Sequence, residues 1–467
     1  MHRKMQLSYS IRESLYFICI KTIEWSLVFI IAIVPLIINP KAFDYWYRPK
    51  IESIYALLII AGVAWLLKAL VKDRSFLWEG SPLTIPLLCY ASATTLSTIF
   101  SINVRLSLYG DPLRVEGLYT ILTYISLVFV FINLVRNQEL VRKLFKGLFI
   151  GATLVSLYAL IQYFGYNPTE HFYFKYITKG RIAVGSTIGN PNFLGKYLVL
   201  IIPIMFCFCL GSISVKRSVV LVSALSLCFA ALIVTYTRAS WLSTIIALVV
   251  LLFLSFKNSL HKGEKKRLII IGVILFLLIL FFNAYSPRHS KKRVTSNNQK
   301  ATGEVVKRTL STFDIKKGMG VATRLYVWEK TLLLIKDRPW FGYGLETFEI
   351  AFKDYNIEYV KIFNNLVYID RAHNNYIDTA FSIGLIGLGT YLAVIVTFLY
   401  HLFSLLKKSD DKFHKLLYAG IISSFCGYLI NDIFIFSVVS VSPTFWSLMG
   451  LTVAMGKVNG QVPFHRG

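Results

Sequence analysis

Residues 268–285 read LIIIGVILFLLILFFNAY, an almost unbroken run of isoleucine, leucine, valine and phenylalanine without a charged side chain. A helix needs about 20 mostly apolar residues to cross the hydrocarbon core of a bilayer, so this stretch predicts a membrane-spanning helix. The whole chain has the same character, because 55% of its 467 residues are hydrophobic and only 16% are charged. Soluble domains carry charge on about a quarter of their residues, so the composition excludes a soluble protein.

Apolar stretches of similar length follow one another along the chain. The twelve candidate spans are 20–39, 53–71, 82–100, 117–135, 145–164, 194–211, 218–236, 240–256, 268–285, 376–402, 413–431 and 437–456. The sequence therefore predicts an all-α polytopic membrane protein with about 12 transmembrane helices, forming a single integral membrane domain over 1–467. The short connection between the seventh and eighth spans also predicts a tight helical hairpin.

The lysines and arginines of the short loops indicate the orientation of the spans. Most of them lie in loops on the side of the N-terminus, and cytoplasmic loops are enriched in these residues. An even number of spans returns the chain to its starting side, so we expect both termini to be cytoplasmic. The net charge of +26 is then spread over loop ends rather than over one folded soluble face, and no nucleic-acid partner is expected.

One long loop, 286–375, is expected on the outer side. Its first part, 287–320, is basic and irregular and is typical of a linker. Apolar residues then recur at helical spacing, which predicts an amphipathic helix over 324–337 at the outer membrane face, with Thr323 as its N-cap. Pro339 is expected to end that helix, and 339–344 reads as a turn.

Two outer arginines are candidates for binding an anion. Arg238 lies in the connection of the predicted hairpin, where its guanidinium could hold a phosphate with two hydrogen bonds. Arg324 is expected in the first turn of the amphipathic helix, and the free N–H groups of a helix start favour an anion. The alternatives are an arginine reaching to the membrane interface for Arg238, and a solvated side chain beside Glu329 and Asp337 for Arg324.

His373 lies where the long loop re-enters the membrane. A neutral imidazole is a suitable general base for a hydroxyl near neutral pH, although a single histidine is more often structural. The outer loop 109–117 brings Arg114 and Glu116 to the start of a span, which alone suggests only a local ion pair. The sequence shows no Asp-x-Asp motif or outer carboxylate cluster that would indicate a metal.

The residues after His373 resemble a known signature. His373-Asn374, nine further residues and then Gly384-Leu385-Ile386-Gly387 resemble the His-[Asn/Ser/Gln]-x9-Gly-x-x-Gly motif of the O-antigen ligase family. The hairpin with Arg238, the pair Arg324 and Trp328, and the 339–344 turn followed by Phe348 resemble the rest of the family pattern, as do the twelve spans and the single large outer loop.

This resemblance implies a membrane glycosyltransferase of the C-type fold in a bacterial inner membrane, with its active site facing the periplasm and with no cofactor or metal. His373 would be the general base, Arg238 and Arg324 would bind the pyrophosphate, and Arg114 and Asn374 would be supporting substrate contacts. The implied donor is a glycan on undecaprenyl pyrophosphate, and the implied acceptor is lipid A-core or another glycan, with membrane lipid around the protein.

Two alternatives stay open at this point. O-antigen ligation is the first expectation, but a polymerase of the same family would use the same donor chemistry. A transporter or flippase for lipid-linked oligosaccharides is the alternative from another class. It would require buried charges in the middle of the spans or an internal repeat, and neither is apparent in the sequence.

Overall fold

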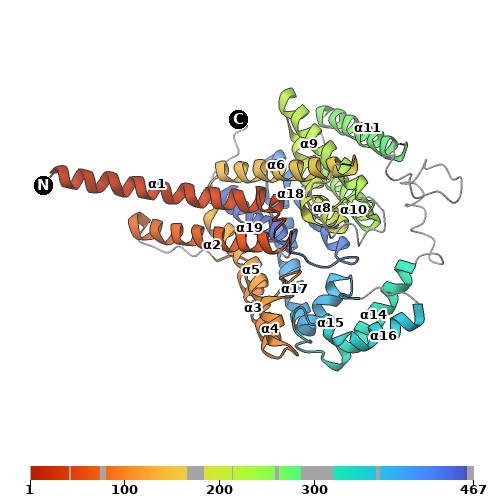
Figure 1. Ribbon diagram of the computed structural model, residues 1–467. Helices are drawn as coiled ribbons and strands as arrows, with labels where there is room; N and C mark the ends of the chain where they lie inside the picture. Colours follow the sequence, from red (N-terminus) through yellow and green to blue (C-terminus); the bar gives the residue numbers. More distant parts are fainter. Residues whose placement is uncertain are drawn as a thin grey trace.

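The structure is a computed structural model that describes residues 2–41, 44–73, 80–165, 184–212, 214–257, 262–284, 319–363 and 369–459. Within these ranges the chain forms helices and no strand (Figure 1). The helices are α1 (His2–Ala32), η1 (Val34–Leu36), α2 (Arg48–Lys68), η2 (Ala69–Asp73), α3 (Thr84–Ile99), α4 (Val104–Tyr109), α5 (Leu118–Leu134), α6 (Gln138–Tyr163), η3 (Ser186–Ile188), α8 (Pro191–Gly211), α9 (Val215–Val234), α10 (Arg238–Lys257), α11 (Lys262–Ala284), α14 (Met319–Asp337), α15 (Phe348–Ala351), α16 (Lys353–Phe363), α17 (Asn375–Lys408), α18 (Lys412–Asn431) and α19 (Ser442–Asn459).

The predicted all-α membrane protein is confirmed. Among the described residues, nine helices are long and apolar enough to cross a membrane. The shorter apolar helices α3 and α5 have 16 and 17 residues and coincide with two further predicted spans. The total of twelve spans and the direction in which they cross the membrane stay predictions.

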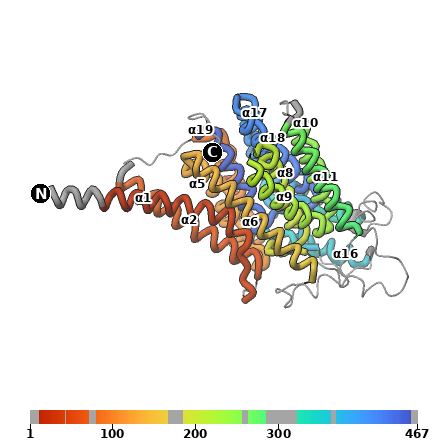
Figure 2. Tube along the Cα trace, turned by 90° about the horizontal axis from the view of Figure 1, so that it is seen from above, coloured from red at the N-terminus to blue at the C-terminus, as the bar shows by residue number. Residues whose placement is uncertain are grey.

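Helix α8 lies at the centre of the bundle. Its most apolar window is 94% buried, against 17% for α2 and for α11, because α8 packs on α18, α9 and α10 at once. Figure 2 shows these long helices side by side, whereas α1 and α2 extend together away from the bundle. A helix that is apolar on all faces is expected in such a central position.

The predicted hairpin is confirmed in its short connection but not in its packing. Helix α9 packs mainly on α6 and α8, while α10 packs on α18 and α8. The close approach of α10 and α18 has a clear cause, since Gly427 faces Ala247 and Ser243 of α10 and leaves no room for a side chain. Small residues permit such contacts between membrane helices. Asn431 adds hydrogen bonds to the Ser240 and Ser243 hydroxyls at 3.2 and 3.3 Å.

Helices α14 to α16 lie together at one end of the molecule (Figure 1). They share a second small hydrophobic core with the first turns of α17. The amphipathic helix predicted over 324–337 is present, and it ends before Pro339 as expected. It begins earlier than predicted, at Met319, so Thr323 is not its N-cap and Arg324 lies beyond its first turn. Instead, the Thr323 hydroxyl lies 2.9 Å from the Tyr359 hydroxyl. Most of the predicted linker 287–320 lies outside the described residues.

Two lysines that lie close to the start of a predicted span are fully buried in helices. Lys50 belongs to α2, and its ammonium donates to three backbone carbonyls at 2.7 to 2.9 Å. Lys196 belongs to α8 and forms an ion pair with the equally buried Asp432. A buried charge is costly unless it is paired or hydrogen-bonded, and both ammonium groups meet that condition.

Candidate active site

His373 lies in the short segment that leads into α17, and its neighbours hold this segment on both sides. The N–H of Ala372 donates to Asp378 Oδ1 at 2.9 Å, and its carbonyl accepts from the indole N–H of Trp328 at 2.9 Å. The N–H of Asn375 donates to the Asp432 carbonyl at 2.8 Å. Between these anchors His373 has a φ of 52°, a left-handed conformation that costs a non-glycine residue about 1–3 kcal/mol.

Asn374 begins α17 as its N-cap. Its side-chain oxygen accepts hydrogen bonds from the N–H groups of Tyr376 and Ile377 at 3.0 and 3.2 Å. This is the usual role of asparagine at a helix start. It occupies the side-chain oxygen of Asn374, a residue that the family resemblance predicts as a substrate contact. The N-terminus of α17, which is the positive end of its helix dipole, therefore lies directly beside His373.

Gly384 of the signature marks a kink in α17, where its φ is 73°. The predicted turn 339–344 packs directly on this kink. The N–H of Leu385 donates to the Pro339 carbonyl at 2.7 Å, and the N–H of Tyr343 donates to the Phe381 carbonyl at 2.9 Å. A side chain at position 384 would collide with the backbone of Trp340. The glycine is therefore required for the contact that ties α14, which carries Arg324, to α17, which follows His373.

The structure brings the two predicted anion-binding arginines close together. Arg238 is exposed at the start of α10, and Arg324 is half-buried on α14. Burial lowers the pKa of Arg324, and the positive charge of Arg238 lowers it further. The Arg324 guanidinium donates to the Phe434 carbonyl at 3.4 Å. Two guanidinium groups that repel each other form a strong site for a multiply charged anion.

Phe436, in the segment between α18 and α19, is surrounded by the remaining charged groups. Its ring centroid lies 5.4 Å from that of His373, 5.6 Å from the Arg114 guanidinium and 5.5 Å from that of Arg371. The buried Lys196 fixes this segment, because its ammonium also donates to the Phe436 carbonyl at 3.2 Å.

The environment of His373 strongly favours the neutral imidazole. Burial has the largest effect and lowers its pKa, and the charges of Arg324, Arg114 and Arg371 add to it, to give a pKa of about 4. Neutral imidazole is the form that accepts a proton. His373 is thus unprotonated near neutral pH, at the centre of a cationic site.

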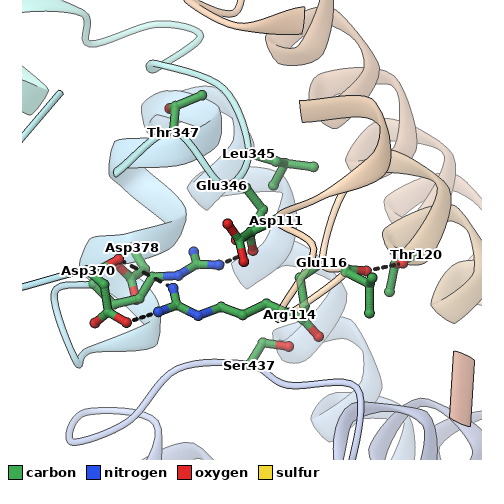
Figure 3. Close-up of polar contacts among 12 residues, drawn as sticks. Asp111, Arg114, Glu116, Thr120, Leu345, Glu346, Thr347, Asp370, Asp378 and Ser437 are labelled. Carbon is green, nitrogen blue, oxygen red and sulfur yellow. Dashed lines mark hydrogen bonds and ion pairs between the residues drawn. The ribbon is translucent and has the colours of Figure 1, made fainter. Parts of the chain in front are cut away.

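Arg114 pairs across the fold and not with Glu116. Its guanidinium forms an ion pair with Asp370, just before the His373 segment (Figure 3). Glu116 instead accepts a hydrogen bond of 2.7 Å from the Tyr124 hydroxyl. The predicted local ion pair between Arg114 and Glu116 is therefore wrong. Arg114 instead links the loop before α5 to the loop before α17.

Residues 221–392 match the family model described as O-antigen ligase. This match over part of the chain supports a member of the O-antigen ligase family. The matched region includes Arg238, Arg324 and His373, while Arg114 and Phe436 lie outside it and are brought to the same site by the fold. No curated protein matches the chain.

The O-antigen ligase signature leaves several site residues unmarked. Arg371 forms a buried ion pair with Glu346, which follows the 339–344 turn. Glu346 also has a positive φ, of 62°, as does Val115 with 52°. The charged residues Asp370 and Arg371 lie close to His373 in the sequence and could have indicated a charged site around it. The sequence contains no comparable indication for Asp432, Phe434 and Phe436, because these residues lie in or beside apolar stretches.

Proposed function

We propose that this protein is a membrane glycosyltransferase that moves a glycan from undecaprenyl pyrophosphate to an acceptor hydroxyl, and specifically an O-antigen ligase that joins polysaccharide to lipid A-core. The match of residues 221–392 to the O-antigen ligase family model supports the broader activity. The observation that carries the proposal is a neutral histidine among arginines at one end of an apolar bundle. A polyprenyl tail suits the bilayer around such a bundle, and a pyrophosphate suits the arginines.

In this proposal, Arg238 and Arg324 bind the pyrophosphate of the donor. Burial and, to a smaller extent, the charge of Arg238 lower the pKa of Arg324, and an anion bound between the two arginines relieves their repulsion. Negative charge increases on the pyrophosphate as its bond to the sugar breaks, so fixed guanidinium groups stabilise the transition state more than the ground state. Loss of one such donor typically slows a reaction by about a hundred- to a thousandfold.

His373 then acts as the general base. The acceptor hydroxyl oxygen forms a bond to the anomeric carbon, its proton passes to the imidazole, and the pyrophosphate leaves with the electron pair of the broken bond. A base with a pKa of about 4 is weak for this step, but the bound pyrophosphate offsets the charges of Arg324 and its neighbours. Donor binding thus raises the basicity of His373 when it is needed. A single displacement of this kind inverts the anomeric carbon and requires no metal.

The test is the substitution His373→Ala in the full-length protein, with His401→Ala as the matched control at the far part of α17. Transfer from a lipid-linked glycan should be lost in the first variant, whereas membrane insertion and donor binding should persist. The control should retain activity. Full transfer by His373→Ala would remove the histidine from the mechanism.

A polymerase of the same family remains the alternative, because the donor-side residues would serve it equally. A deletion strain separates the two. Loss of capped lipid A-core with accumulation of lipid-linked polymer supports a ligase, whereas single repeats without long polymer support a polymerase. A transporter is less well supported, since the buried charges Lys196 and Asp432 lie near helix ends and pair with each other.

A further inference from the structure

A polar cavity of about 70 Å³ lies behind Phe436, next to the His373 site. One water molecule needs about 10–15 Å³ of such space, so the cavity has room for several waters or for one small ring with its hydroxyl groups. Its lining residues include Glu116, Glu346, Asp378, Arg371, Asn375 and Trp446. The donor-side residues Arg238 and Arg324 do not line it, and His373 adjoins it through Phe436.

Two buried polar atoms of this lining lack a hydrogen-bond partner. Asp378 is 5% exposed, and its Oδ1 binds the Ala372 N–H, but its Oδ2 has no partner. Arg371 is 8% exposed, and its guanidinium pairs with Glu346, but its Nε–H has no partner. Buried polar atoms are nearly always satisfied, so an acceptor and a donor lining one cavity indicate a ligand that supplies both. A sugar hydroxyl does so, because it donates and accepts.

The cavity is lined by more acidic than basic side chains, with Glu116, Glu346 and Asp378 against Arg371. Arg371 is paired with Glu346 and Arg114 with Asp370, which leaves the carboxylates of Asp378 and Glu116 without an ion-pair partner of their own. Figure 3 shows Glu116 pointing toward Ser437, on the far side of Arg114 from Asp370. Burial raises the pKa of Glu116 to about 7, with the Glu346 carboxylate contributing. An added anion in this cavity would be repelled, whereas an amine would be attracted.

The position of the cavity suits the second substrate. Arg371 and Asp378, which line the cavity, flank His373 in the sequence. Phe436 contacts both His373 and Arg371 and forms part of the cavity wall. The aromatic side chains Tyr124 and Trp446 complete the wall, and aromatic faces with carboxylates are suited to a hydroxyl-rich ring. Among the described residues, no group of three His, Cys, Asp or Glu side chains is arranged for a metal ion.

We propose that this cavity is the acceptor subsite and that it takes a neutral or amine-bearing sugar ring, with Asp378 and Arg371 holding its hydroxyl groups, while it rejects sugars that carry a carboxylate or phosphate. The proposal rests on the glycosyltransferase function proposed above. It makes Asp378 a determinant of acceptor specificity.

Binding of small glycosides tests the subsite without turnover. The full-length protein in nanodiscs is titrated with methyl glucoside, methyl glucosaminide and methyl glucuronide, and binding is followed by saturation-transfer NMR. The amine and the neutral sugar should bind at least about tenfold more tightly than the carboxylate. Absence of binding by all three, which would mean a cavity for water only, overturns the proposal, and so does equal binding of the glucuronide.

The substitution Asp378→Asn keeps the side-chain shape and an oxygen for the Ala372 N–H but removes the charge. Hydrogen bonds to charged groups contribute enough for a change of about 10- to 100-fold, so affinity for the glucosaminide should fall by that factor. The preference over the glucuronide should disappear at the same time. A structural defect would weaken all three glycosides equally, and an unchanged preference therefore contradicts the proposal.

Glu349→Gln is the matched control, because Glu349 is exposed on α15 and lies outside the cavity. Should Asp378→Asn fail to fold, Glu116→Gln tests the same loss of preference. The transfer assay with His373→Ala is independent of these titrations. A protein that binds the glycosides as expected but transfers nothing has lost the proposed function, whereas one that transfers without the charge preference has lost only this subsite.

Discussion

The indole N–H of Trp328 should determine how well His373 is positioned. It donates to the carbonyl of Ala372, a fully buried residue, at 2.9 Å. The next residue, His373, is held at a φ of 52°, which carries a cost of about 1–3 kcal/mol. The hydrogen bond from Trp328 is one of the contacts that offset this strain, together with that from Ala372 to Asp378.

The substitution Trp328→Phe removes the donor and keeps an aromatic ring. It leaves the Ala372 carbonyl without its partner, at a cost of about 1–3 kcal/mol, because the buried site has limited access to water. The equilibrium constant for the conformation with His373 in place then falls about 5- to 150-fold. We therefore expect kcat to fall by about 10- to 100-fold.

The assay is transfer from a fluorescent lipid-linked glycan by the full-length protein in proteoliposomes, with kcat and donor affinity measured separately. Donor affinity should change little, since Arg238 and Arg324 are retained. Trp340→Phe is the control, because Trp340 is 64% exposed and makes no comparable contact with the His373 segment. A kcat for Trp328→Phe equal to that of this control would refute the reasoning, and so would an equal loss of donor affinity and kcat.

Two further predictions concern the charge on His373 and the kink in α17. Arg324→Gln should lower the rate by about 10²- to 10³-fold. It should also move the acid limb of kcat/KM from about pH 4 to higher pH. Protonation inactivates His373 as a base, and the variant lacks one positive charge that opposes this protonation. An acid limb that stays in place or moves to lower pH would contradict this explanation. Gly384→Ala should reduce thermal stability and activity, since its φ of 73° and the nearby Trp340 backbone exclude a side chain. Gly389→Ala has open space around it and should behave as the unsubstituted protein in the same thermal scan and transfer assay.

Local patterns were sufficient for much of this protein. The apolar runs predicted the helices, because the length of a spanning segment is set by the bilayer and not by its neighbours. The signature after His373 and the turn at 339–344 were recognisable for a similar reason, since glycine and proline act on the backbone locally. Boundaries were less certain, as the early start of α14 at Met319 shows.

Pairings between distant residues could not be predicted in this way. Lys196 and Asp432 look like isolated charges at the ends of predicted spans, yet they form a buried ion pair. Arg114 seemed to pair with its neighbour Glu116, whereas the fold gives it Asp370. Each partner lies on a different helix or loop, and only the packing of helices decides which of several opposite charges comes within reach.

The sequence by itself determined that the chain is an all-α membrane protein, that its charged loops lie at helix ends, and that His373 lies where the chain enters a span that carries the Gly-x-x-Gly signature. These features depend on hydropathy and on backbone conformation, which act over a few residues. Only the tertiary structure decided that Arg324, Arg114 and Arg371 act together on His373 and that an acidic cavity lies behind Phe436. Electrostatic effects and cavities depend on distances through space, and residues more than a hundred positions apart create them here.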